Sequence, residues 1–181
     1  MVFEIAERRT TYEGRLLRLE ELLLADESGG QARREVVRHP GAVAVVPVFS
    51  DHTTVLCKQY RVAVDEHLVE VIAGKLKPGE DPEECARREL AEEAGLEAER
   101  LVRLATFYTS PGFCDEVMHV FMAREVRAIP AGSSPAGLEE QQMTLIKVRI
   151  GAWHGLLEGG TLRDAKSIVA LCLAARALGM G

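Results

Sequence analysis

The chain lacks several features that mark whole classes of protein. Its 181 residues include no apolar run near the roughly 18 residues that a membrane-spanning helix needs, and charged residues replace a signal-like hydrophobic segment at the N-terminus. The five histidines are scattered without metal-type spacing, and the four cysteines form neither a CxxC motif nor a secreted disulfide framework. We therefore expect a cytoplasmic protein with reduced thiols and no membrane partner.

Positive charge is also in short supply. Lysine and arginine number 22 against 28 aspartates and glutamates, which gives a net charge of −6. General nucleic-acid binding needs a basic stripe that displaces counterions, so this function is excluded. The hydrophobic content of 47% and a mean hydropathy of −0.01 allow one domain with a sizeable core and a small appendage.

The strongest signal is the stretch GKLKPGEDPEECARRELAEEAGL, residues 74–96. Its fixed positions are glycines and charged residues: Gly74, Glu80, Arg88, Glu89, Glu92, Glu93 and Gly95. Asp81 is a good N-cap, Pro82 suits the first helical position, and Gly95 can adopt the left-handed conformation that ends a helix. The sequence therefore predicts a helix over 82–94.

Two carboxylates of this helix face inward. Ala86, Leu90 and Ala94 form its apolar stripe, Glu93 falls inside that stripe, and Glu89 lies on its border. An ionised carboxylate is costly to bury unless it is paired or bound to a metal, and Mg²⁺ prefers oxygen ligands and often shares substrate phosphates. A solvated charged helix face is the alternative, and the fixed glycine, glutamate and arginine spacing argues against it.

In this pattern the stretch resembles the Nudix box of the Nudix hydrolases, which cleave a nucleoside diphosphate linked to another moiety. The resemblance implies an α/β fold, a Nudix-type α/β/α sandwich with a mixed sheet, and Mg²⁺ or Mn²⁺ on the box helix. The implied metal ligands are Glu89, Glu92, Glu93 and the carbonyl of Ala73, with Glu89 and Glu93 also catalytic. The positions implied to orient the loop and helix are Gly74, Glu80, Arg88 and Gly95.

Other segments resemble the ADP-ribose pyrophosphatase group of that family. These are the Gln-Tyr-Arg run at 59–61, Glu70 ahead of the Ala-Gly pair, and Ser110-Pro111-Gly112. Many relatives have proline where this chain has Ile72. The resemblance implies that Arg61 contacts a phosphate or the distal sugar, and that Ser110, Pro111 and Gly112 contact the substrate.

This resemblance implies hydrolysis of ADP-ribose to AMP and ribose 5-phosphate. Relatives carry the general base on a mobile loop, so Glu139 or Glu140 is implied as the base, and the box-helix glutamates are the alternative. Another nucleoside diphosphate sugar, such as ADP-glucose or GDP-mannose, is an alternative substrate. A non-catalytic ADP-ribose sensor is a remote alternative, because such modules commonly lose box glutamates.

The chain divides at His39-Pro40-Gly41. We expect an N-terminal β segment over 1–40 and a hydrolase domain over 41–181. Residues 14–24 and 31–38 read as strands of an antiparallel hairpin, although 14–24 also reads as a short helix. Further strands are predicted at 42–49, 53–60, 68–72, 101–108, 116–123 and 142–150, and helices at 151–158 and 163–178.

A lone two-stranded hairpin is marginal in water, so the N-terminal segment needs a docking surface. The resemblance implies a homodimer in which this segment is exchanged between subunits. By position, Arg34 and Glu35 are its candidates for substrate contact. An ordinary charged surface strand is the alternative.

Overall fold

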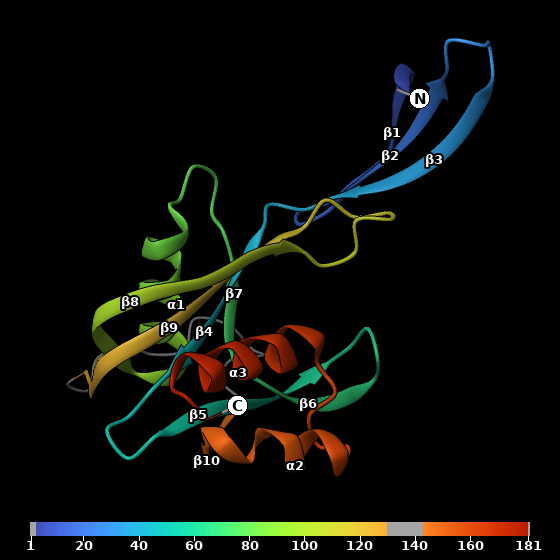
Figure 1. Ribbon diagram of the computed structural model, residues 1–181. Coiled ribbons are helices and arrows are strands. Elements are labelled where there is room, and N and C mark those ends of the chain that lie inside the picture. The colour runs from blue at the N-terminus through green and yellow to red at the C-terminus, as the bar shows by residue number, and fades with distance from the viewer. Residues whose placement is uncertain (1–2, 130–142, 181) are drawn as a thin grey trace. The chain divides into compact units, whose positions relative to one another are not determined.

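The computed structural model describes residues 3–129 and 143–180 (Figure 1). They form two compact units: the residues up to Gly41 together with Phe107–Val117, and Ala42–Thr106 together with the residues from Met118 on. The first unit thus also takes in residues 107–117. The predicted functional division into 1–40 and 41–181 stays a prediction.

The first unit is built on a three-stranded antiparallel sheet in the order β1-β2-β3. Its strands are β1 (Glu4–Glu13), β2 (Arg18–Ala25) and β3 (Gln31–Arg38). The hairpin turn is closed by Asp26, whose Oδ1 accepts hydrogen bonds from the Ser28 and Gly30 amides, both at 2.8 Å. The prediction of a hairpin is incomplete, and the helical alternative for 14–24 is wrong. Strand β1 was missed because it is exposed along its whole length, so no apolar alternation marks it.

The second unit contains two sheets, in the orders β7-β4-β9-β8 and β10-β5-β6. The strands of the first are β4 (Ala42–Pro47), β7 (Ile72–Lys75), β8 (Leu96–Tyr108) and β9 (Val117–Ala128). Those of the second are β5 (Thr53–Arg61), β6 (Glu66–Glu70) and β10 (Thr144–Arg149). Strand β4 runs antiparallel to β7 and parallel to β9, so the sheet is mixed, as predicted.

The strand predicted at 68–72 is two strands, β6 and β7, which belong to different sheets. The break falls at Val71, whose amide donates to the hydroxyl of Ser167 at 2.9 Å. Val69, Val71 and Ile72 are apolar and buried, and for this reason the sequence looks like one continuous strand.

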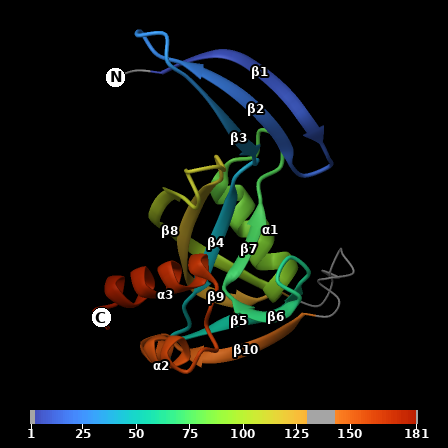
Figure 2. The same cartoon turned by 90° about the vertical axis from the view of Figure 1, so that its right-hand side faces the viewer.

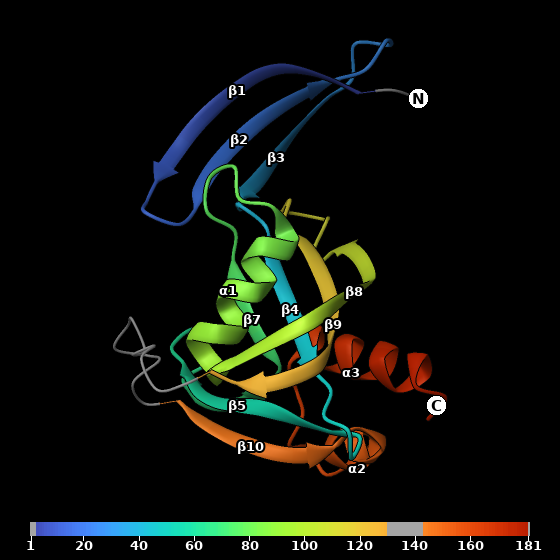
Figure 3. The same ribbon diagram turned by 90° about the vertical axis from the view of Figure 1, so that its left-hand side faces the viewer.

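The described residues of the second unit form four helical elements, and two of them, the longer helices, cover the four-stranded sheet. The four elements are α1 (Pro82–Ala94), the 3-10 turn η2 (Ile150–Ala152), α2 (Trp153–Glu158) and α3 (Ala165–Ala177). Helix α1 packs on β7 and β4 and α3 packs on β4, which gives the predicted α/β/α layering (Figures 2 and 3). The core beneath α1 joins residues from β4, β7, β9 and the helix: Val43, Val45, Ile72, Ala86, Leu90 and Phe121. None of the described helices has the length and apolar content to cross a membrane.

Candidate active site

Helix α1 begins and ends where the sequence predicts. Asp81 caps it by accepting a hydrogen bond from the Glu83 amide, and Gly95 follows it in the left-handed conformation with φ 62°. Ala86 and Leu90 are fully buried. Only 7% of the surface of Glu89 is exposed to solvent, so this carboxylate lies on the inward side of the helix.

Both inward carboxylates meet the main chain of β7. Glu93 Oε2 accepts a hydrogen bond from the Ala73 amide at 3.2 Å. A Cβ placed on Gly74 would lie 1.9 Å from Cδ and Oε1 of Glu89, so the glutamate occupies the space that any side chain at 74 would need. Glycine is therefore required at this position if Glu89 is to keep its place.

Arg88 connects the loop before α1 to the helix carboxylates. Its guanidinium donates to both carboxylate oxygens of Glu80, at 2.8 and 2.9 Å, and to the Lys75 carbonyl at 3.1 Å. It also donates to Glu89 at 2.6 Å and Glu92 at 3.1 Å. The hydrogen bonds from Arg88 lower the pKa of Glu80 to about 2, against the opposing effect of burial. This geometry supports the orienting role predicted for Glu80 and Arg88.

The chemistry of these donors fits a hard divalent cation. Among the described residues, no three His, Cys, Asp or Glu side chains are arranged to hold a metal ion, and Arg88 takes Glu89 and Glu92 as partners. Glu89 and Glu93 nevertheless place carboxylate oxygens against the Ala73-Gly74 main chain. Oxygen donors of this kind are those that Mg²⁺ and Mn²⁺ prefer.

Arg61, at the end of β5, is held in a defined orientation. It donates to both oxygens of Glu70 at 2.8 and 2.7 Å, and Glu70 is 1% exposed. Lys166 of α3 donates to the same carboxylate at 2.5 Å. The hydrogen bonds that Arg61 donates to Glu70 raise the pKa of Arg61 against desolvation, and the charge of Glu93 adds to the effect. Arg61 is therefore within electrostatic reach of the box helix.

Cys57, also on β5, lies close to the carboxylate of Glu93. Its Sγ is 4.0 Å from Glu93 Oε2. Burial raises its pKa far above the ordinary value, and the charges of Glu93 and Glu70 add to the effect. The thiol is thus held protonated and contributes packing to the site.

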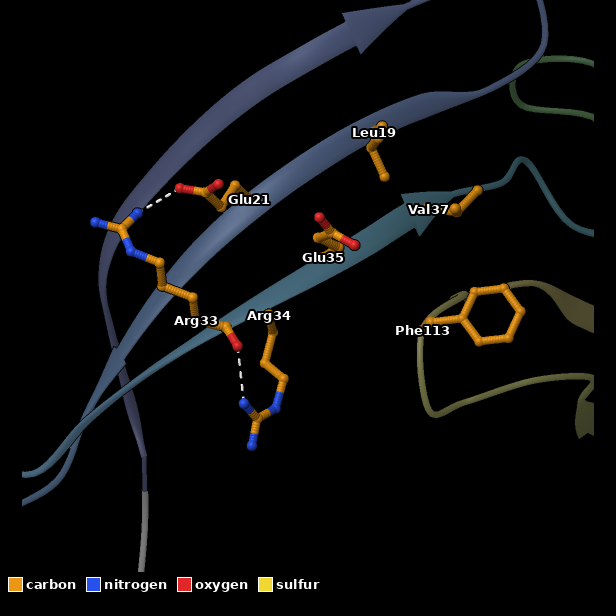
Figure 4. Close-up of a pocket in the computed structure, with 7 residues that line it drawn as sticks. All are labelled: Leu19, Glu21, Arg33, Arg34, Glu35, Val37 and Phe113. Atoms are coloured by element: carbon orange, nitrogen blue, oxygen red, sulfur yellow. Dashed lines mark hydrogen bonds and ion pairs between the residues drawn. The ribbon is translucent and has the colours of Figure 1, made fainter.

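The first unit contains a pocket of about 510 Å³ beside strands β2 and β3 (Figure 4). The lining residues are Leu19, Glu21, Arg33, Arg34, Glu35, Val37 and Phe113. Arg33 points toward Glu21 and pairs with it, and Arg34 donates to the Arg33 carbonyl at 2.8 Å. The pocket combines two guanidinium groups, two carboxylates and an exposed aromatic ring.

The Ser110-Pro111-Gly112 loop shapes this pocket indirectly. The Ser110 carbonyl accepts hydrogen bonds from the amides of Phe113 and Cys114, and the Phe113 carbonyl accepts one from Val37 of β3 at 2.7 Å. Phe113, 59% exposed, lines the pocket, whereas residues 110–112 do not. The loop thus sets the ring of Phe113 in place.

Sequence reasoning missed most of the pocket. The unpredicted residues are Leu19, Glu21, Val37 and Phe113. In the ladder between β2 and β3, residue 19 pairs with 37 and residue 21 pairs with 35. All four numbers are odd, and alternate residues of a strand lie on the same face of the sheet. That alternation was the available signal, and the apolar run at 22–24 obscured it.

The predicted site residues fall into three groups. The structure brings together Ala73, Gly74, Glu80, Arg88, Glu89, Glu92 and Glu93, with Arg61 nearby and Gly95 ending the helix. The residues placed in the first unit are Arg34, Glu35, Ser110, Pro111 and Gly112. Glu139 and Glu140 lie outside the described residues. The roles assigned to all of these residues stay predictions.

The chain matches one protein family and is similar to several known proteins. The NUDIX domain family matches residues 38–159. The chain is 36% identical to a methanol dehydrogenase activator of Bacillus methanolicus, over 88% of this chain and 85% of that protein. It is 39% identical to an ADP-ribose pyrophosphatase of Bacillus subtilis (80% and 77%) and 32% identical to a GDP-mannose pyrophosphatase of Klebsiella pneumoniae (83% and 79%).

A solved structure shares the fold. The crystal structure of an ADP compounds hydrolase aligns with a TM-score of 0.85 at 24% identity and covers 99% of this chain and 95% of its own. At that identity the likeness shows the fold alone. The match to the family covers more than half of the chain, and the helix over 82–94 and the α/β/α layers are those that the sequence predicts. The chain belongs to the NUDIX domain family.

Proposed function

We propose that this protein hydrolyses the pyrophosphate of ADP-ribose to AMP and ribose 5-phosphate, with Mg²⁺ or Mn²⁺ as cofactor. The observation that carries the proposal is the packing of Glu89 and Glu93 against the Ala73-Gly74 main chain. The similarity to the Bacillus subtilis ADP-ribose pyrophosphatase supports the substrate.

The reaction adds water to one phosphorus and breaks the bond from that phosphorus to the bridging oxygen. Glu89 and Glu93, with Glu92 and the Ala73 carbonyl, would hold the ion. The ion supplies positive charge that stabilises the charge developing on the pyrophosphate. Arg61 binds a phosphate or the distal sugar through its guanidinium group, whose orientation is set by the hydrogen bonds from Nε and Nη2 to Glu70.

A general base must accept the proton of the attacking water. We assign this role to Glu139 ahead of Glu140, at the positions where the family resemblance implies the base. Arg88 keeps the box carboxylates oriented during the reaction, because it joins Glu80 to Glu89 and Glu92.

The pocket of the first unit is assigned to substrate recognition in a homodimer with exchanged N-terminal segments. Arg34 and Glu35 offer paired donors and acceptors, and the exposed ring of Phe113 offers a stacking surface. Strand β1 leaves an exposed edge carrying Ile5 and Tyr12, which favours pairing with a second chain.

A related nucleoside diphosphate sugar is the second candidate substrate. The similarity to the Klebsiella pneumoniae GDP-mannose pyrophosphatase supports GDP-mannose, and ADP-glucose shares the same pyrophosphate chemistry. A non-catalytic sensor is disfavoured, because the box retains all of its glutamates.

The test is a panel of ADP-ribose, ADP-glucose and GDP-mannose with Mg²⁺ or Mn²⁺ and identification of the products. We expect ADP-ribose to give the highest kcat/KM, and activity to disappear with a chelator and return with the ion. Glu84→Gln, at an exposed position of the same helix, is the control for charge removal. Absence of hydrolysis across the panel would overturn the proposal.

Mixed dimers test the exchange of segments. If Arg34 serves the partner's site, an equal mixture of co-expressed Glu93→Gln and Arg34→Ala chains should recover about a quarter of wild-type activity, since half of the dimers then hold one complete site. Each variant alone should be nearly inactive. A monomer of full activity, or a mixture no better than its parts, would contradict the exchange.

A further inference from the structure

A charged cluster joins the start of α3 to the candidate site, although α3 lies beyond the residues that match the family. Asp164 caps the helix by accepting from the Ser167 amide at 3.0 Å and from the Ser167 hydroxyl. Its other oxygen is 3.0 Å from the Lys166 ammonium, which donates to Glu70. A continuous chain of contacts therefore runs from the first turn of α3 to the carboxylate that holds Arg61.

The cluster is balanced in charge. Two carboxylates, Asp164 and Glu70, face two cations, Lys166 and Arg61. Glu70 is buried, and a buried carboxylate stays ionised only with partners. Burial raises its pKa, but the hydrogen bonds from Arg61 and the charge of Lys166 prevail and lower it. Glu70 can therefore serve as a fixed, charged bracket for Arg61.

Helix stability does not explain the lysine. A cation in the first turn lies at the positive end of the helix dipole, which is unfavourable. Lys166 is nevertheless nearly buried there, at 16% side-chain exposure, and its ammonium points to Glu70 Oε2, the same oxygen that accepts from Arg61 Nη2. This arrangement locks the rotation of the Glu70 carboxylate, and with it the plane of the guanidinium.

The same turn of α3 also fixes the chain that leads into β7. The Ser167 hydroxyl accepts from the Val71 amide, between Glu70 and the strand that carries Ala73 and Gly74. One helical turn thus supports the side chain of Arg61 and the main chain that meets the box glutamates.

We propose that Lys166 is a positioning residue for substrate binding, acting on Arg61 through Glu70, so that a helix beyond the residues that match the family sets the affinity for the pyrophosphate substrate. The proposal rests on the proposed function, in which Arg61 binds a phosphate or the distal sugar. Arg61 touches the substrate whether or not the transition state is reached, so Lys166 affects KM more than kcat.

Lys166→Met removes the charge and keeps an unbranched side chain. We expect KM for ADP-ribose to rise at least about tenfold while kcat stays within about threefold. Lys166→Arg should recover most of the affinity. Arg163→Met is the matched control, because Arg163 pairs with Glu66 of the same strand as Glu70 but at an exposed position, and its KM should not change.

A double-mutant cycle separates positioning from general stabilisation. In an Arg61→Met background, Lys166→Met should add less than about twofold to KM, since its effect passes through the missing guanidinium. A wild-type KM in the single variant, or a full additional effect in the double variant, would overturn the proposal. If Lys166→Met does not fold, Lys166→Gln removes the charge and shortens the side chain that reaches Glu70, and an unchanged KM in that variant overturns the proposal.

Failure of the proposed function gives a different result. A wild-type protein that leaves ADP-ribose intact overturns the substrate assignment. The Lys166 variants are then compared on whichever nucleoside diphosphate sugar the panel identifies, because the cluster needs only a substrate that Arg61 can contact.

Discussion

A methyl group at residue 74 tests directly whether the position of Glu89 matters. In Gly74→Ala the new Cβ would lie 1.9 Å from Cδ and Oε1 of Glu89 and 2.4 Å from Oε2, whereas real contacts of this kind stay above 3.0 Å. Gly74 is paired with Val43 in the ladder between β7 and β4, so the backbone is fixed. The carboxylate must therefore move by at least the difference between 3.0 and 1.9 Å, or about 1.1 Å.

We expect this displacement to lower kcat/KM for ADP-ribose about 100-fold, since misplacing a catalytic group by 1 Å can have an effect of that size. The fold should survive, because the atoms that give way end a flexible side chain. Steady-state kinetics and thermal unfolding of the same preparations measure both quantities. Gly155→Ala, where a Cβ meets nothing within 4 Å, is the control.

The loss of activity in Gly74→Ala should also depend on which residue occupies position 89. In a Glu89→Gln protein, Gly74→Ala should add little further loss, because the displaced carboxylate is already neutral. Activity within threefold of wild type in Gly74→Ala would refute the link between Gly74 and Glu89. A 100-fold loss that persists in full in the Glu89→Gln background would place the effect elsewhere.

Three further predictions concern single carboxylates. Glu93→Gln should lower kcat at least about 100-fold at saturating Mg²⁺ without unfolding the protein, and near-normal turnover would remove Glu93 from the site. The pKa of Glu80 is depressed to about 2 from 4.5, so its stabilising effect is complete above pH 4.5 and is lost as pH falls toward 2. Thermal unfolding of Glu80→Gln should accordingly depend less on pH over that range, and an unchanged pH dependence would contradict the Glu80–Arg88 link. Glu139→Gln should lower kcat strongly and leave KM within a few-fold, and Glu140→Gln should have a smaller effect on kcat. A larger loss in Glu140→Gln would make Glu140 the base. Full activity in both variants would assign the base to a glutamate of the box helix.

The sequence predicted helix α1 to the residue because its signals are local. Asp81, Pro82 and Gly95 act on backbone groups within one turn, so no distant contact was needed. The break between β6 and β7 could not be predicted in this way, since it depends on a hydrogen bond from Val71 to Ser167, 96 residues further along the chain.

The site divides along the same line. Spacing alone identifies Glu89 and Glu93 as inward carboxylates and Gly74 as a fixed position of the motif. It does not show that the Glu89 carboxylate occupies the space that a side chain at residue 74 would need. The orientation of Arg61 is harder to predict from the sequence, because it depends on the contact between Lys166 and Glu70. These two residues are 96 positions apart in the chain and belong to different layers of the fold. A motif can therefore specify which groups perform the chemistry, whereas a distant helix decides where one of them points. If that division is correct, substrate affinity among proteins with an intact box should depend on the first turn of the C-terminal helix, and turnover on the box itself.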